Sequence, residues 1–129
     1  MALNLSKVLL VDDEPDIRRI GQISLEHVGQ WTVVQAQSGL QALIVAADER
    51  PDVILLDVMM PELDGPGTFA RLRENPATAG IPVIFMTAKA QPHEVASYRA
   101  LGAAGVIAKP FDPMTLPAEV RTIVEALDA

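Results

Sequence analysis

The chain has 129 residues, of which 50% are hydrophobic and only 4% aromatic, and its formal net charge is −7. We expect residues 1–129 to form one domain with an aliphatic core, because this length leaves no room for a second fold. The acidic balance argues against direct nucleic-acid binding, and the lack of cysteine excludes disulfides and thiolate sites.

The expected compartment follows from features that the sequence lacks. No apolar stretch reaches the roughly 18 residues of a membrane span. Residues 1–7 lack the long apolar region of a signal peptide, and without cysteine an oxidising compartment has no support. We therefore expect a soluble, cytoplasmic protein that does not bind membranes.

The first half of the chain predicts two strand–helix units and a third strand. The strands are the apolar runs at residues 8–11, 31–34 and 53–56. Proline suits a first helical turn, so the first helix is expected to begin near Pro15, and Gly29 ends it. Ser38 caps a second helix, whose apolar residues recur at helical spacing until Pro51 breaks it.

The second half continues the alternation. Turn-forming residues 60–65 precede a short helix at about residues 67–73. Two more strands, at residues 83–86 and 106–108, are followed by helices at residues 92–101 and 116–127. Gly102 closes the first of these helices.

Five strand–helix units with short connections predict an α/β fold with a five-stranded parallel sheet. Four of the apolar runs, all except residues 31–34, are typical of strands buried on both faces. Right-handed crossovers then place helices on both sides of the sheet, which makes a doubly wound, three-layer arrangement.

Each of those four runs ends at a polar residue: Asp12, Asp57, Thr87 or Lys109. Taken singly, each residue has an ordinary structural interpretation, such as a helix N-terminus, a turn cap or a solvated charge. Ligands of doubly wound folds, however, bind beyond the carboxyl ends of the strands. The coincidence of four strand ends therefore predicts one functional site.

The residue types at this site suit phosphoryl transfer. Asp12, Asp13 and Asp57 would repel one another unless a cation compensates their charge, and Mg²⁺ prefers oxygen ligands of this kind. A carboxylate beside such a metal can attack phosphorus and form an acyl phosphate. Lys109 would neutralise the transferred group, and the Thr87 hydroxyl would detect whether Asp57 is modified.

Over essentially its whole length, the sequence resembles the receiver domain of two-component response regulators. The resemblance rests on four segments in the same order and spacing: VLLVDDEP, ILLDVMMPELDG, VIFMTA and IAKPF. It implies the flavodoxin-like (βα)5 fold of chemotaxis regulators. It also implies a phosphorylation-activated signalling switch in a phosphorelay, which catalyses only its own phosphorylation and autodephosphorylation.

The resemblance also assigns roles to individual residues. Asp57 would accept the phosphoryl group from a histidine kinase or a histidine phosphotransfer protein. Mg²⁺, or Mn²⁺ in its place, would be bound by Asp12, Asp13, Asp57 and the backbone carbonyl of Met59. Lys109 would contact the phosphoryl group, and its bond to the following proline would be cis.

One position departs from the family pattern, and two others lie where family members differ in reactivity. Val106 stands where many members carry an aromatic switch residue, so we expect Thr87 to move on phosphorylation while Val106 only repacks. Met59 and Lys89 lie where family members tune attack of water on the acyl phosphate. A bulky Met59 predicts slow autodephosphorylation.

Two other functions remain open on sequence grounds. A Mg-dependent phosphatase of the haloacid dehalogenase type also uses an aspartate nucleophile, but it usually carries a second aspartate where this chain has Met59. A docking domain that works without phosphorylation would be favoured only by a degraded site. The sequence itself ends soon after the last expected helix, so we expect no output domain within it.

The resemblance implies protein partners on both sides of the signal. The upstream kinase or phosphotransfer protein would dock near Ile17 and Ile20. A downstream effector, or a fused output domain, would recognise the surface of the last two helices and the last strand. We expect no direct contact with nucleic acid or membrane.

Overall fold

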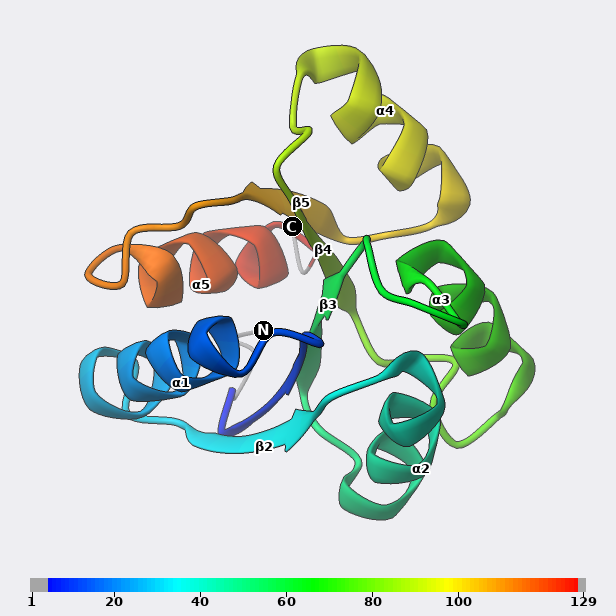
Figure 1. Ribbon diagram of the computed structural model, residues 1–129, viewed down its shortest axis with the longest axis horizontal. Coiled ribbons are helices and arrows are strands. Elements are labelled where there is room, and N and C mark those ends of the chain that lie inside the picture. Colours follow the sequence, from blue (N-terminus) through cyan, green and yellow to red (C-terminus); the bar gives the residue numbers. More distant parts are fainter. Residues whose placement is uncertain (1–4, 128–129) are drawn as a thin grey trace.

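The computed structural model describes residues 5–127, which form one five-stranded parallel sheet (Figure 1). The strand order is β2-β1-β3-β4-β5. The strands are β1 (Lys7–Val11), β2 (Thr32–Ala36), β3 (Val53–Asp57), β4 (Val83–Thr87) and β5 (Gly105–Ala108). Residues 1–4, part of the segment expected to lack a signal-peptide region, lie outside the described residues.

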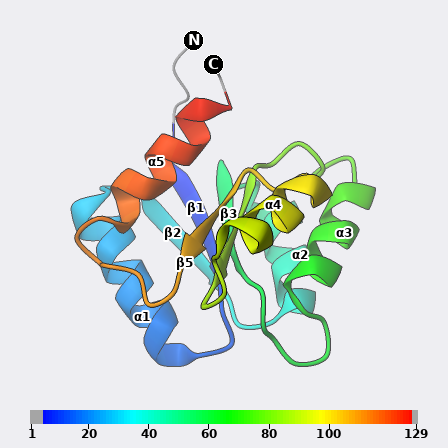
Figure 2. The ribbon, with the colours of Figure 1, turned by 90° about the horizontal axis from the view of Figure 1, so that it is seen from above.

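Helices cover both faces of the sheet, as Figures 1 and 2 show. One face carries α1 (Pro15–Ile23), its π-helical continuation η1 (Ser24–Val28) and α5 (Leu116–Ala126). The other carries α2 (Gly39–Glu49), α3 (Gly65–Glu74) and α4 (Pro92–Leu101). This confirms the predicted doubly wound, three-layer fold. Among the described residues, no helix is long and apolar enough to cross a membrane.

The strands contribute side chains to two separate hydrophobic cores, because successive side chains point to opposite faces of a sheet. Leu9, Leu56 and Phe85 pack toward α2, α3 and α4. Leu10 and Leu55, one residue away on their strands, pack toward η1 and α5. Central strands buried on both faces therefore hold the sheet rigidly between its helices.

The prediction of burial on both faces was wrong for the last apolar run. β5 lies at the edge of the sheet, where Val106 is only partly buried and Ala108 is exposed. By contrast, β3 and β4 are buried along their whole length. An edge strand has a neighbour on one side only, and a run of apolar residues does not reveal which strand takes that place.

Local signals placed most helix ends correctly. Ser38 caps α2 by accepting a hydrogen bond from the Gln41 amide at 3.1 Å. Gly102 ends α4 with a φ of 110°, a conformation that favours glycine. The third helix begins earlier than predicted, at Gly65, because Asp64 caps it by accepting from the Gly67 amide at 2.8 Å.

Candidate functional site

Four polar residues lie at one edge of the sheet, where the carboxyl ends of four neighbouring strands meet. Asp12 directly follows β1, Asp57 ends β3, Thr87 ends β4, and Lys109 directly follows β5. The strands end at matching heights, since the register pairs Asp57 with Met86 and Thr87 with Ala108. The structure thus brings the four predicted residues to one edge.

Lys109 joins the two innermost carboxylates. Its ammonium donates to Asp12 Oδ2 at 2.7 Å and to Asp57 Oδ1 at 3.0 Å. Asp12 is fully buried and Asp57 is 3% exposed, so both ion pairs are shielded from solvent. The backbone of Lys109 is fixed as well, because its amide donates to the Thr87 carbonyl at 2.9 Å.

Asp13 completes a cluster of three carboxylates with Asp12 and Asp57. One oxygen of each lies within 4.8 Å of the others. Asp13 is only partly buried, so the cluster opens to solvent on its side. Three hard oxygen donors at this spacing fit a small divalent cation, which the cluster could hold with water completing its coordination.

Burial and crowding change the proton affinity of the site. Burial, reinforced by the negative charge of Asp12, raises the pKa of Asp57 to about 6, although Lys109 opposes the shift. Burial lowers the pKa of Lys109, but hydrogen bonds to Asp12 and Asp57 outweigh that effect and raise it overall. At neutral pH the site therefore contains an ionised Asp57 beside a charged ammonium.

Thr87 occupies the neighbouring strand end. It is 3% exposed, and its hydroxyl oxygen accepts a hydrogen bond from the Lys89 amide at 3.0 Å. The hydroxyl is thereby tied to the loop that leads from β4 toward α4. A movement of Thr87 would disturb this loop directly.

The loop after β3 sets the surroundings of Asp57. The Met59 side chain is 74% exposed, whereas Met60 is buried. The metal-binding role of the Met59 carbonyl and the slow autodephosphorylation stay predictions. Gly65 approaches the backbone of β3 so closely that a Cβ there would lie 2.5 Å from the Asp57 carbonyl oxygen.

The sequence indicates only a turn at Gly65 and no particular role for Arg18. The Arg18 guanidinium donates to the Asp12 carbonyl oxygen at 2.6 Å. No sequence pattern predicts the Arg18–Asp12 contact or the approach of Gly65 to Asp57, because each depends on how the folded chain places one residue against the backbone of a strand end. The predicted cis peptide between Lys109 and Pro110 is present.

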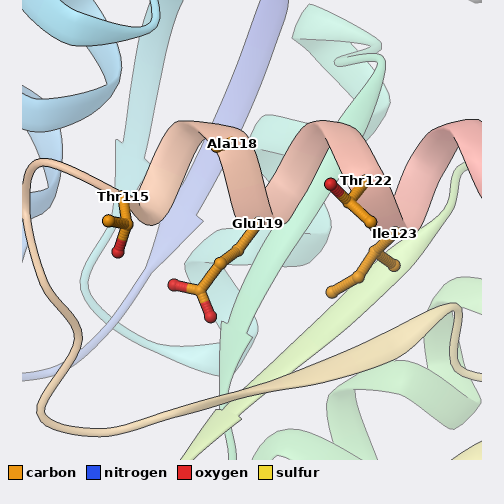
Figure 3. Close-up of a pocket in the computed structure, with 5 residues that line it drawn as sticks. All are labelled: Thr115, Ala118, Glu119, Thr122 and Ile123. Atoms are coloured by element: carbon orange, nitrogen blue, oxygen red, sulfur yellow. The ribbon is translucent and has the colours of Figure 1, made fainter.

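A separate shallow pocket of about 290 Å³ lies along α5 (Figure 3). Glu119 and Ile123 project from the same side of the helix, one turn apart. The pocket is lined by Thr115, Ala118, Glu119, Thr122 and Ile123. Among the described residues that line it, Glu119 alone is charged, and none belongs to the carboxylate cluster.

Comparison with known proteins gives one consistent result. Residues 8–121 match the response regulator receiver domain family. A probable transcriptional regulator, ycf27 of Cyanophora paradoxa, is 40% identical over 96% of this chain and 50% of its own length. The phosphate regulon regulator PhoB of Pseudomonas aeruginosa is 36% identical over 91% of this chain and 51% of its length.

Solved structures agree with the fold. The chemotaxis protein CheY4 of Vibrio cholerae superimposes with a TM-score of 0.84 and 32% identity, covering 93% of this chain and 99% of that one. A putative response regulator from Chloroflexus aurantiacus superimposes with a TM-score of 0.83 and 30% identity, covering 95% of this chain and 99% of that one.

The extent of these matches differs between the two kinds of relative. The chain spans about half the length of the curated relatives that it matches, but nearly the whole length of the two solved structures. None of the four relatives supports the phosphatase alternative. With its sheet order, its strand-end residues and its matched segment all in agreement, the chain belongs to the response regulator receiver domain family.

Proposed function

We propose that residues 1–129 form a single receiver domain whose Asp57 accepts a phosphoryl group and thereby switches the domain's partner binding. The observation that carries this proposal is the position of Asp57. Its carboxylate is buried at the centre of the site, contacts the Lys109 ammonium at 3.0 Å and belongs to the three-carboxylate cluster.

The cluster would hold Mg²⁺, or Mn²⁺ in its place, through Asp12, Asp13, Asp57 and the Met59 backbone carbonyl. The bound cation would neutralise charge on the transferred phosphoryl oxygens. The spacing and the oxygen chemistry of the three carboxylates support this assignment. Asp12 is the most restrained of them, since its Oδ1 also accepts from the Glu14 amide at 2.9 Å.

The reaction is a displacement at phosphorus. An Asp57 carboxylate oxygen attacks the phosphorus of a phosphohistidine, the new O–P bond forms, and the P–N bond breaks with its electron pair returning to the imidazole nitrogen. Lys109 then balances the negative charge gathered on the phosphoryl oxygens. Hydrolysis of the acyl phosphate by water restores Asp57, so the domain acts on itself rather than on an external substrate.

The signal would leave the site through Thr87. Its hydroxyl oxygen accepts from the Lys89 amide, and the same hydroxyl can donate its proton to a phosphoryl oxygen on Asp57, so movement of Thr87 toward that group would pull on this loop. Reshaping of this loop would shift α4. Val106, paired with Phe85 on β4, would only repack.

We assign the partners to two surfaces. A histidine kinase or phosphotransfer protein would dock beside α1, where Ile20 is 44% exposed and Ile17 is partly buried. An effector, or an output domain fused to this one, would read the α4–β5–α5 surface in the cytoplasm. The net charge of −7 argues against direct nucleic-acid contact by this domain.

Incubation with acetyl phosphate and Mg²⁺, followed by intact-mass analysis, tests the proposal. We expect a single phosphate adduct that Asp57→Asn abolishes and that chelation of the metal prevents. Asp48→Asn, which removes an exposed carboxylate of α2, is the matched control and should retain the adduct. An adduct that persists in Asp57→Asn, or repeated turnover of phosphate esters, would contradict the proposal.

A further inference from the structure

We propose that Arg18 is a positioning residue for the cation site, because it holds the turn that presents Asp12 and Asp13. Its Nη1 donates to the Asp12 carbonyl oxygen at 2.6 Å, and its side chain is partly buried. The inference rests on the proposed function and extends it from the residues that touch the cation to one that supports them.

The held carbonyl controls the direction of Asp13. It belongs to the planar peptide that joins Asp12 to Asp13, so fixing its oxygen fixes the plane from which the Asp13 side chain departs. Among the described residues, none donates a hydrogen bond to the Asp13 carboxylate itself. The orientation of Asp13 toward the cluster therefore depends on its backbone.

Arg18 completes the restraint of Asp12. The Asp12 amide donates to the Ala36 carbonyl at 3.2 Å, and its carboxylate accepts from the Glu14 amide and from Lys109. With the Arg18 contact, every polar atom of Asp12 has a partner. A turn fixed at all of these points needs little reordering when a cation binds.

The position of Arg18 in α1 explains how it reaches the turn. Pro15 starts the helix, and the Arg18 amide closes its first turn on the Glu14 carbonyl at 3.1 Å. Long side chains in helices point back toward the helix N-terminus. Arg18 therefore extends toward β1, whereas Arg19 is exposed and makes no hydrogen bond or ion pair with another described residue.

The two possible roles of Arg18, positioning the turn or only adding positive charge, predict opposite effects of its removal on Mg²⁺ affinity. If Arg18 acted only as a positive charge near the site, it would repel Mg²⁺, and its removal would tighten binding. If it positions the turn, its removal loosens the carboxylates and weakens binding. The direction of the change in affinity distinguishes these roles.

The experiment measures the Mg²⁺ dissociation constant of the unphosphorylated protein by titration of backbone amide NMR signals, with Arg18→Met as the main variant. We expect Arg18→Met to weaken binding by about tenfold or more, as loss of a supporting hydrogen bond does at other metal sites. Broadening of the Asp13 amide signal should accompany the loss. Arg19→Met, which removes the same charge one residue away, should bind Mg²⁺ as wild type does or slightly tighter.

Arg18→Lys keeps the charge and one possible hydrogen bond, so its affinity should lie between those of wild type and Arg18→Met. Unchanged or tighter binding in Arg18→Met would overturn the inference, and so would equal weakening in Arg19→Met. If Arg18→Met failed to fold, weaker binding by a folded Arg18→Lys would support the inference and unchanged binding would overturn it. Wild-type protein that failed to bind Mg²⁺ would instead overturn the proposed function itself.

Discussion

At the scale of single residues, Asp57 shows how reactivity opposes stability. Folding buries its carboxylate beside Asp12, and this raises its pKa to about 6 from the ordinary 3.8. The folded state therefore holds a proton more tightly than the unfolded chain does. The contribution of Asp57 to the free energy of unfolding falls as pH rises from about 4 to 6 and stays low above that range.

Asp57→Asn should consequently stabilise the metal-free protein at neutral pH. We expect its melting temperature in chelator at pH 7.5 to exceed that of wild type by roughly 3–5 °C. The difference should shrink toward zero near pH 4, where Asp57 of the wild type is protonated. Asp48→Asn should follow the wild type throughout, and a difference independent of pH would argue against the raised pKa.

A second residue-scale prediction concerns Gly65. A Cβ there would lie 2.5 Å from the Asp57 carbonyl oxygen and 2.8 Å from the Val58 Cα, and neither backbone atom can turn away. Gly65→Ala should lower the free energy of unfolding by about 1–3 kcal/mol, as overpacking does, and slow phosphorylation by acetyl phosphate. Denaturant unfolding and intact-mass time courses measure the two effects.

Gly80→Ala is the control for this substitution, because a Cβ at Gly80 would meet no atom within 4 Å. It should change the free energy of unfolding by less than about 0.5 kcal/mol and leave phosphorylation unchanged. Equal losses in both variants would show that the close approach of Gly65 to β3 is unimportant.

At the scale of elements, α4 is the helix held least firmly. None of its residues is buried, whereas α5 buries Leu116, Pro117, Val120 and Val124. Among its contacts, the Tyr98 ring centroid lies 5.0 Å from that of Phe85, and the Arg73 guanidinium donates at 3.0 Å to the carbonyl of Gly102, just after the helix. A helix with so few buried contacts can move without disturbing either core.

Hydrogen exchange should reveal this difference. We expect backbone amides of α4 to exchange at least about tenfold faster than those of α5, because local opening of α4 exposes little apolar surface. Arg73→Met should accelerate exchange in α4 further while leaving α5 unchanged. Mass spectrometry of peptides covering residues 92–101 and 116–126 provides the measurement, and equal protection of the two helices would contradict the prediction.

At the scale of the whole molecule, the site joins segments that are distant in sequence. Lys109, just after β5, contacts Asp12 at the end of β1 and Asp57 at the end of β3. Its amide also donates to the Thr87 carbonyl, which links the end of β4 to the same site. A cation held by the cluster would bind the folded chain but not the unfolded one, in which these segments separate. Cation binding should therefore stabilise the entire fold.

Replacing chelator by saturating Mg²⁺ at pH 7.5 should raise the wild-type melting temperature. A concentration of 100 times the dissociation constant corresponds to about 2.7 kcal/mol of stabilisation. Asp57→Asn removes one negative ligand and should lose most of this gain, while Asp48→Asn should keep it. Thermal unfolding followed by circular dichroism gives the comparison, and equal gains in all three proteins would argue against the cation site.

Much of the fold could be predicted from the chain because its signals are local. The apolar runs, Ser38 before α2 and Gly102 after α4 each act on their own neighbourhood. Signals of this kind also placed Asp12, Asp57, Thr87 and Lys109 at strand ends, since each directly follows or closes an apolar run. Parallel pairing then brings the carboxyl ends of the strands to the same side of the sheet, whatever the strand order.

The sequence by itself thus determined the five strand–helix units and the chemistry available at the ends of the strands. Only the tertiary structure decided which strands lie at the edges of the sheet, and so why Val106 is only partly buried. It alone revealed the approach of Gly65 to Asp57 and the Arg18 contact with the Asp12 carbonyl. Both features depend on how close the folded chain brings a residue to the backbone of another segment, and residue identity along the chain does not encode such distances locally.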